Sequence, residues 1–76
     1  MLKLNPVSYK KLVCVFEKYG FVHSRTKGDH LIYTKKHNSR PLVIPMYNQI
    51  PLFVIKNLIR TAGIAREEYL ATLRQC

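Results

Sequence analysis

Apolar residues recur at spacings of three and four along the first part of the chain, which is the period of a helix with one buried face. Asn5, Pro6 and Ser8 precede this run, and all three suit the start of a helix. Gly20 follows the run and suits the position just beyond a helix end. We therefore predict a helix whose buried stripe consists of Tyr9, Leu12, Val13, Phe16 and Tyr19.

A second run with the same period begins near Pro51 and stops at Gly63. Phe53 falls on its opposite face among polar and basic residues, where an exposed aromatic side chain is a candidate protein contact. A short third helix is predicted over residues 66–74, with acidic residues first and Arg74 last, as the helix dipole favours. The predicted buried stripe of the second helix consists of Leu52, Ile55, Leu58, Ile59 and Ala62.

Three runs rich in β-forming residues, 21–26, 30–35 and 40–44, lie between the two long helices. Both connections are short and contain turn-forming residues, so we expect an antiparallel meander. Adjacent apolar residues in the second and third strands leave open which face of the sheet His30 occupies. The predicted fold class is α+β, in the order α-β-β-β-α with a three-stranded antiparallel sheet and a short C-terminal helix.

The chain is strongly basic, with 13 Lys and Arg against 4 Asp and Glu in 76 residues and a formal net charge of +9. Such a domain usually binds nucleic acid, an anionic membrane surface or an acidic protein. We expect one domain over residues 1–76, no membrane partner and a cytoplasmic location, because the sequence lacks a signal peptide and any bilayer-spanning run. Two cysteines are too few for a disulfide framework, and helical spacing places Cys14 partly exposed.

His30 is the candidate catalytic residue, because it begins the second predicted strand with Arg25 and Lys27 close by. Histidine is the standard side chain most able to exchange protons near neutral pH. RNA supplies its own nucleophile, the ribose 2′-OH, so cleavage requires a base to deprotonate it and cations to stabilise the developing charge. We expect no metal and no small-molecule cofactor, because His23, His30 and His37 lie apart from paired cysteines or clustered carboxylates.

Several segments of the chain resemble the HicA toxin family, also called YcfA-like, over about residues 5 to 73. The resemblance implies the double-stranded-RNA-binding fold, the activity of an mRNA interferase, and catalysis by His30 in a Gly-x-His motif. It also implies a HicB-like antitoxin that covers His30. The segments are Tyr19-Gly20-Phe21, Lys27-Gly28-Asp29-His30-Leu31-Ile32-Tyr33, Leu42-Val43-Ile44-Pro45 and the run from Ile55 to Ile64.

The resemblance and the charge together extend the predicted site. Asp29 stands where many family members have Ser, and an acidic residue beside His30 could orient its ring; Leu31 stands where many have a second His. Tyr47 and Phe53 lie in a segment more apolar than is usual in the family, so we predict that they contact the antitoxin. The predicted RNA-binding residues are Arg25, Lys27, Gly28, Lys35, Lys36 and Arg40.

The sequence therefore predicts a metal-independent endoribonuclease toxin of a toxin–antitoxin pair, which cleaves mRNA with His30 as the general base on the 2′-OH. One alternative is a non-catalytic RNA-binding domain of the same fold, in which His30 only contacts phosphate or ribose. A third possibility is a protein-interaction module that uses Phe53 and an apolar edge, and whose positive charge attracts an acidic partner.

Overall fold

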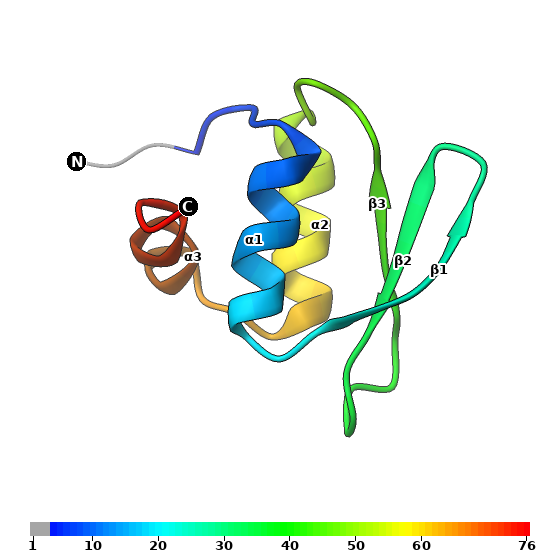
Figure 1. The fold of residues 1–76 in the computed structure, drawn as a ribbon. Helices are drawn as coiled ribbons and strands as arrows, with labels where there is room; N and C mark the ends of the chain where they lie inside the picture. The colour runs from blue at the N-terminus through cyan, green and yellow to red at the C-terminus, as the bar shows by residue number, and fades with distance from the viewer. Residues whose placement is uncertain (1–3) are drawn as a thin grey trace.

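The computed structural model describes residues 4–76, which form three helices and one antiparallel sheet (Figure 1). Their order, α-β-β-β-α-α, confirms the prediction and has the arrangement of a double-stranded-RNA-binding domain. The elements are α1 (Tyr9–Lys18), β1 (Val22–Lys27), β2 (His30–Thr34), β3 (Leu42–Pro45), α2 (Leu52–Ala62) and α3 (Arg66–Leu73).

The ends of α1 follow from local sequence. The side chain of Ser8 accepts a hydrogen bond from the backbone N–H of Lys10 at 3.3 Å, which satisfies one of the unpaired donors of the first turn. Gly20 has φ 94°, and the N–H of Phe21 returns to the carbonyl of Phe16 at 3.1 Å. This left-handed cap reverses the chain and directs it from α1 into β1.

The helices bury the middle of each predicted stripe, while the remaining stripe residues are only partly buried: Tyr9, Val13, Tyr19, Leu52 and Ala62. Leu12 and Phe16 are buried in α1, but so is Val15, outside the predicted stripe. The buried face is wider because α1 packs against both α3 and β3. In α2 the buried residues are Ile55, Leu58 and Ile59, as predicted. None of the helices within residues 4–76 is long and apolar enough to cross a membrane.

The sheet has the order β1-β2-β3 with antiparallel pairing throughout, which confirms the meander. Tyr33 of β2 pairs with Leu42 of β3, and Leu31 pairs with Ile44. Leu42 and Ile44 are fully buried, so this face of the sheet packs against the helices. Figure 1 shows α1 and α2 on the same side of the sheet, while the β1–β2 hairpin projects beyond them.

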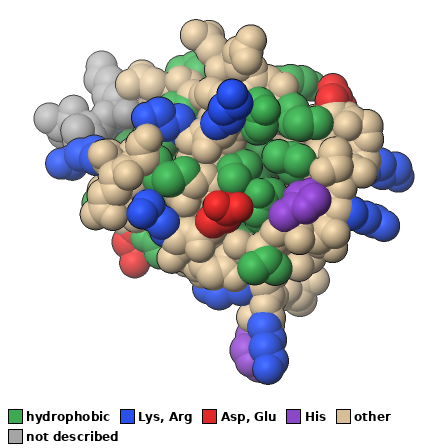
Figure 2. Space-filling view, in the orientation of Figure 1, with side chains coloured by type: hydrophobic (Ala, Val, Ile, Leu, Met, Phe, Trp, Pro, Cys, Tyr) green, Lys and Arg blue, Asp and Glu red, His purple; other side chains and the backbone are tan. Residues whose placement is uncertain are grey.

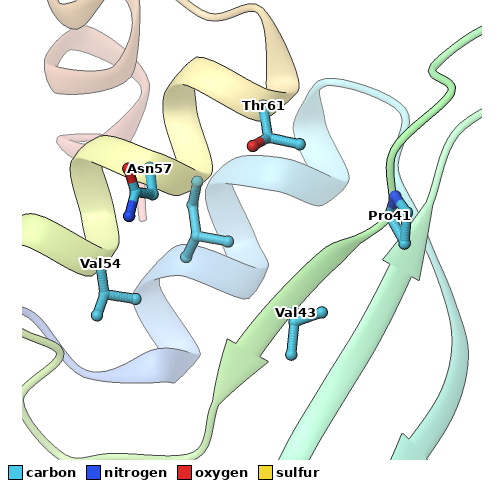
Figure 3. Close-up of a pocket in the computed structure, with 6 residues that line it drawn as sticks. Pro41, Val43, Val54, Asn57 and Thr61 are labelled. Atoms are coloured by element: carbon cyan, nitrogen blue, oxygen red, sulfur yellow. The ribbon is translucent and has the colours of Figure 1, made fainter.

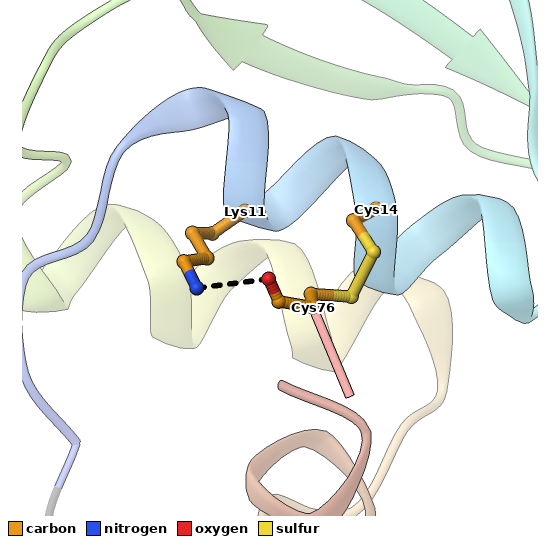
Figure 4. Close-up of a disulfide and its surroundings, with 3 residues drawn as sticks. All are labelled: Lys11, Cys14 and Cys76. Carbon is orange, nitrogen blue, oxygen red and sulfur yellow. Dashed lines mark hydrogen bonds between the residues drawn. A yellow bond between two sulfur atoms is a disulfide. The ribbon is translucent and has the colours of Figure 1, made fainter. Parts of the chain in front are cut away.

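The two cysteines, too few for a disulfide framework, form a single disulfide bond that was not predicted from the sequence. Cys14 of α1 is bonded to Cys76, 62 residues away in sequence (Figure 4). The Nζ of Lys11 also donates a hydrogen bond to the carbonyl of Cys76 at 2.9 Å. Two cysteines so far apart approach each other only because α3 packs on α1, and that contact cannot be inferred from their spacing. Cys14 is therefore not a free thiol in this structure.

Removing this disulfide should destabilise the domain. In the chain-entropy treatment, a cross-link between residues 62 apart stabilises the folded state by up to about 4 kcal/mol. We expect Cys76→Ser to lower the free energy of unfolding by an amount of this order, measured by urea denaturation under oxidising conditions. Adding dithiothreitol should destabilise the wild type to the same level and leave Cys76→Ser unchanged. Equal free energies of unfolding for the wild type and Cys76→Ser under oxidising conditions would contradict the presence of the bond.

Tyr69 of α3 is buried in the core with 1% of its surface exposed, and its hydroxyl has no hydrogen-bond partner among the described residues. An unpaired buried hydroxyl costs free energy, because it has lost its hydrogen bonds to water. Burial also raises the pKa of Tyr69 from 10.0 to about 12. The folded chain therefore retains this proton at a pH where the unfolded chain has already released it.

Two effects of Tyr69→Phe follow. At neutral pH the substitution should raise the free energy of unfolding by about 1 kcal/mol, because it removes an unsatisfied group. Between pH 10 and 12 the unfolded wild type binds fewer protons than the folded one, so its stability falls as the pH rises. Tyr69→Phe should reduce that slope in urea titrations, whereas Tyr47→Phe, at an exposed position, should change neither quantity. A loss of stability in Tyr69→Phe at neutral pH would refute the first effect.

Candidate functional site

A tight hairpin positions His30. Lys27 ends β1 and pairs directly with His30 at the start of β2, so only Gly28 and Asp29 form the connection. Gly28 has φ 61°, which glycine adopts at little cost and which suits the first central position of a two-residue hairpin turn. The predicted turn is thus confirmed, and it places Lys27 across the ladder from His30.

The Asp29 carboxylate lies within hydrogen-bond distance of one nitrogen of the His30 ring. The Nδ1 atom of His30 lies 2.8 Å from Oδ1 of Asp29. An ionised carboxylate only accepts hydrogen bonds, so Nδ1 must carry the proton in this contact. In a neutral ring, Nε2 then has a free lone pair. The His30 side chain is 42% exposed, which leaves that nitrogen accessible to a ligand.

The hairpin register places Arg25 and Lys27 on the same face of the sheet as His30. Lys27 pairs with His30, and Arg25 pairs with Ile32, two residues further along β2. Cross-strand partners share a face, and residues two apart in a strand share it as well. A β-bulge then shifts the register between Arg25 and His23, so that His23 pairs with Tyr33 and lies on the opposite face. The hairpin therefore brings two cations beside His30, and the bulge turns His23 away from them.

His23 lies on the opposite face of the sheet and is not part of this group. It pairs with Tyr33, its ring packs edge-on against the Tyr33 ring with centroids 5.6 Å apart, and its Nε2 lies 2.9 Å from Oγ1 of Thr26. The Tyr33 hydroxyl donates a hydrogen bond to Oε2 of Glu17 at 3.1 Å. Burial, then this hydrogen bond and the charge of Glu17, raises the pKa of Tyr33 above 10.0. Sequence periodicity gave no signal for this cluster.

Lys35, Lys36 and Arg40 lie at the other end of the sheet. They follow β2 and precede β3, whereas His30 begins β2, so the length of a five-residue strand, about 16 Å, separates the two groups. The Nζ of Lys35 sits over the ring of Phe21, 5.5 Å from its centroid. The six predicted RNA-binding residues thus divide between the two ends of β2.

The two predicted antitoxin contacts are both exposed. Tyr47, 45% exposed, lies in the loop between β3 and α2, where its carbonyl accepts a hydrogen bond from the N–H of Tyr9. Phe53, 69% exposed, is in the first turn of α2 and points away from the core. Neither residue lies on the hairpin that carries His30.

Figure 2 shows Lys and Arg side chains scattered over this face with few acidic ones, while hydrophobic side chains gather toward its middle. Within residues 4–76, no three His, Cys, Asp or Glu side chains gather closely enough to hold a metal ion. The chemistry available at the hairpin is therefore that of one imidazole, one carboxylate and two cations. Such a group can transfer a proton and stabilise a phosphate.

Residues 9–64 match the model of a known family, described as HicA toxin of bacterial toxin-antitoxin. The chain belongs to the HicA toxin family. Membership supports a toxin function within a toxin–antitoxin system and implies a partner antitoxin. The match includes the hairpin and both long helices and ends before α3. Among curated proteins, none matches the chain.

The contact between Asp29 and His30 predicts the tautomer of the ring. We expect the ratio of Nδ1–H to Nε2–H tautomer of neutral His30 to be about fivefold higher in the wild type than in Asp29→Ala, since a partly exposed hydrogen bond to a carboxylate is worth about 1 kcal/mol. Imidazole ¹⁵N chemical shifts measure the ratio directly. His37 in its exposed turn serves as an internal control that should not change between the two proteins. The same ratio in the wild type and in Asp29→Ala would show that Asp29 does not orient the ring.

Proposed function

We propose that the protein is a metal-independent endoribonuclease, an mRNA interferase toxin, with His30 as its general base. The observation that supports this best is the placement of His30, Arg25 and Lys27 on one exposed face of the hairpin, with Asp29 bound to Nδ1 of the imidazole. RNA brings the nucleophile, so a base and nearby cations are a sufficient minimal set.

The proposed reaction begins with transfer of the 2′-OH proton of a ribose to Nε2 of His30. The 2′-oxygen attacks the adjacent phosphorus, the bond to the 5′-oxygen breaks, and the first product ends in a 2′,3′-cyclic phosphate. Lys27, directly across the ladder, and Arg25, one diagonal away, stabilise negative charge on the non-bridging oxygens. Asp29 acts through His30 as a positioning residue. Its single negative charge leaves the group net positive beside the two cations.

The proposed partners are mRNA and a HicB-like antitoxin. Lys35, Lys36 and Arg40 would contact phosphates further along the RNA, and Gly28 would allow the backbone to approach closely. The antitoxin would cover His30 and contact Tyr47 and Phe53. We propose a cytoplasmic location, where mRNA is found. Because the cytosol keeps most thiols reduced, the Cys14–Cys76 bond would be open there and the domain correspondingly less stable.

His30→Ala should abolish toxicity and cleavage while the domain stays folded. We expect the cleavage rate constant on an RNA oligonucleotide to fall by about 10²- to 10⁴-fold, the usual contribution of a positioned general base. Growth arrest on expression without a partner should disappear in parallel. His37→Asn is the matched control, because His37 is an exposed histidine with φ 72°, which Asn tolerates. It should cleave as the wild type does.

The product and substrate requirements separate cleavage from mere binding. A single 2′-deoxy sugar at the cut site should leave binding nearly unchanged and prevent cleavage, and EDTA should have no effect. A folded His30→Ala protein that still cleaves would overturn the role of His30. Cleavage of the deoxy substrate, or loss of activity in EDTA, would mean that water or a metal supplies the nucleophile. RNA binding without any cleavage by the wild type would identify a non-catalytic RNA-binding domain.

A further inference from the structure

A groove runs between the outer edge of the sheet and α2, away from the hairpin that carries His30. Its volume is about 290 Å³, at the lower limit of pockets that hold small ligands and suited to one or two side chains. Figure 3 shows the side chains that line it, which come from α2, from β3 and from Pro41 just before that strand. The lining residues, none of them charged or aromatic, are Pro41, Val43, Val54, Asn57, Leu58 and Thr61.

The backbone of β3 offers hydrogen bonds along one wall of this groove. Met46, just beyond β3, donates its N–H to the carbonyl of Asp29 at 2.8 Å. Met46 and Asp29 are therefore a hydrogen-bonded pair in the sense of an antiparallel ladder. Hydrogen-bonded and non-hydrogen-bonded pairs alternate along an antiparallel ladder. Counted from Met46, the pair of Val43 and Ile32 is non-hydrogen-bonded, so the N–H and C=O of Val43 point away from β2 toward the free edge. Pro41 and Pro45 flank Val43 and have no N–H to donate.

The free edge of β3 can therefore accept another strand at few positions only. Prolines protect an exposed edge against unspecific pairing, because they remove donors from it. One residue, Val43, still presents both a donor and an acceptor, and its side chain, with 44% of its surface exposed, lines the groove. Asn38 donates hydrogen bonds to the carbonyls of Arg40 and Thr61 and so connects the segment before β3 to α2. An extended segment lying along β3 would find a single pairing position.

The segments that form the groove carry basic but no acidic side chains. From residue 30 to residue 66, through β2, β3 and α2, the chain has six Lys and Arg and no Asp or Glu. Helical spacing places Arg60 and Phe53 one turn to either side of Asn57, along the rim of the groove. Both residues are exposed. A ligand with acidic residues beside an apolar one would match this pattern.

We propose that this groove binds an extended, acidic segment of a protein partner by β-strand addition to Val43. A residue of the segment pairs its backbone with the N–H and C=O of Val43, and an adjacent apolar side chain enters the groove. Its acidic residues lie near Arg60. Single-stranded RNA fits less well, because stacking on aromatic side chains holds its bases and the groove wall has none. The proposal goes beyond RNA cleavage and stands if His30 is not catalytic.

A defined peptide tests the proposal. The probe is a short synthetic peptide with a Leu-Val-Leu centre between Asp and Glu residues, titrated into ¹⁵N-labelled full-length protein. We expect shifts at the amides of Val43, Val54 and Asn57, and slower hydrogen exchange at Val43. Methylating the backbone nitrogen that donates to Val43 should weaken binding about tenfold, as loss of one hydrogen bond would. His30→Ala protein should bind the peptide as the wild type does.

Charge reversals in the protein provide the matched comparison. Arg60→Glu and Asn57→Glu should each weaken peptide binding about fivefold, because each places a carboxylate beside the acidic segment. Arg74→Glu is the control, since Arg74 is also a basic residue at a helix C-terminus and carries the same helix-dipole cost. No shift at Val43 up to about 1 mM peptide, or equal binding by Arg60→Glu and the wild type, would overturn the proposal. Shifts at Val43 caused by oligouridylate and not by the peptide would overturn it in favour of RNA.

Discussion

The central strand β2 controls which side chains this molecule presents, because its two faces have different neighbours. Tyr33 and Leu31 pair with Leu42 and Ile44 on the face packed against the helices. Side chains alternate along a strand, so burying this face turns His30 and Ile32 to the other side. A shift of one residue in this register would bury His30 and expose Tyr33. Core packing therefore determines the accessibility of His30.

The hairpin register and the β-bulge in β1 together determine which side chains of β1 lie beside His30. Burial does not determine the facing of β1, since all six of its residues are exposed. The extra residue between His23 and Arg25 changes the phase of the strand, so that His23 faces the helix side with Tyr33 while Arg25 and Lys27 face the His30 side. The two histidines of this hairpin are thus separated by the sheet, and only one of them lies among cations.

The domain presents two surfaces with different chemistry. The hairpin carries the imidazole, its carboxylate and the two cations, all exposed to a large ligand such as RNA. The groove between β3 and α2 carries apolar walls and one backbone pairing position, which suits a peptide. The hairpin surface uses β1 and β2, whereas the groove uses β3. A partner protein could therefore reach one surface while its neighbouring parts cover the other.

Periodicity and turn chemistry in the sequence were sufficient for the element order, both long helices, the meander and the hairpin turn at Gly28, because each depends on residues close together in the chain. The facing of His30, the phase shift at the bulge, the burial of Val15 and the bond between Cys14 and Cys76 were not predictable in this way. Each depends on packing between segments far apart in the chain: β2 on the helices, α1 between α3 and β3, and α3 on α1. Such contacts have no signature in local spacing, so only the tertiary structure decided them.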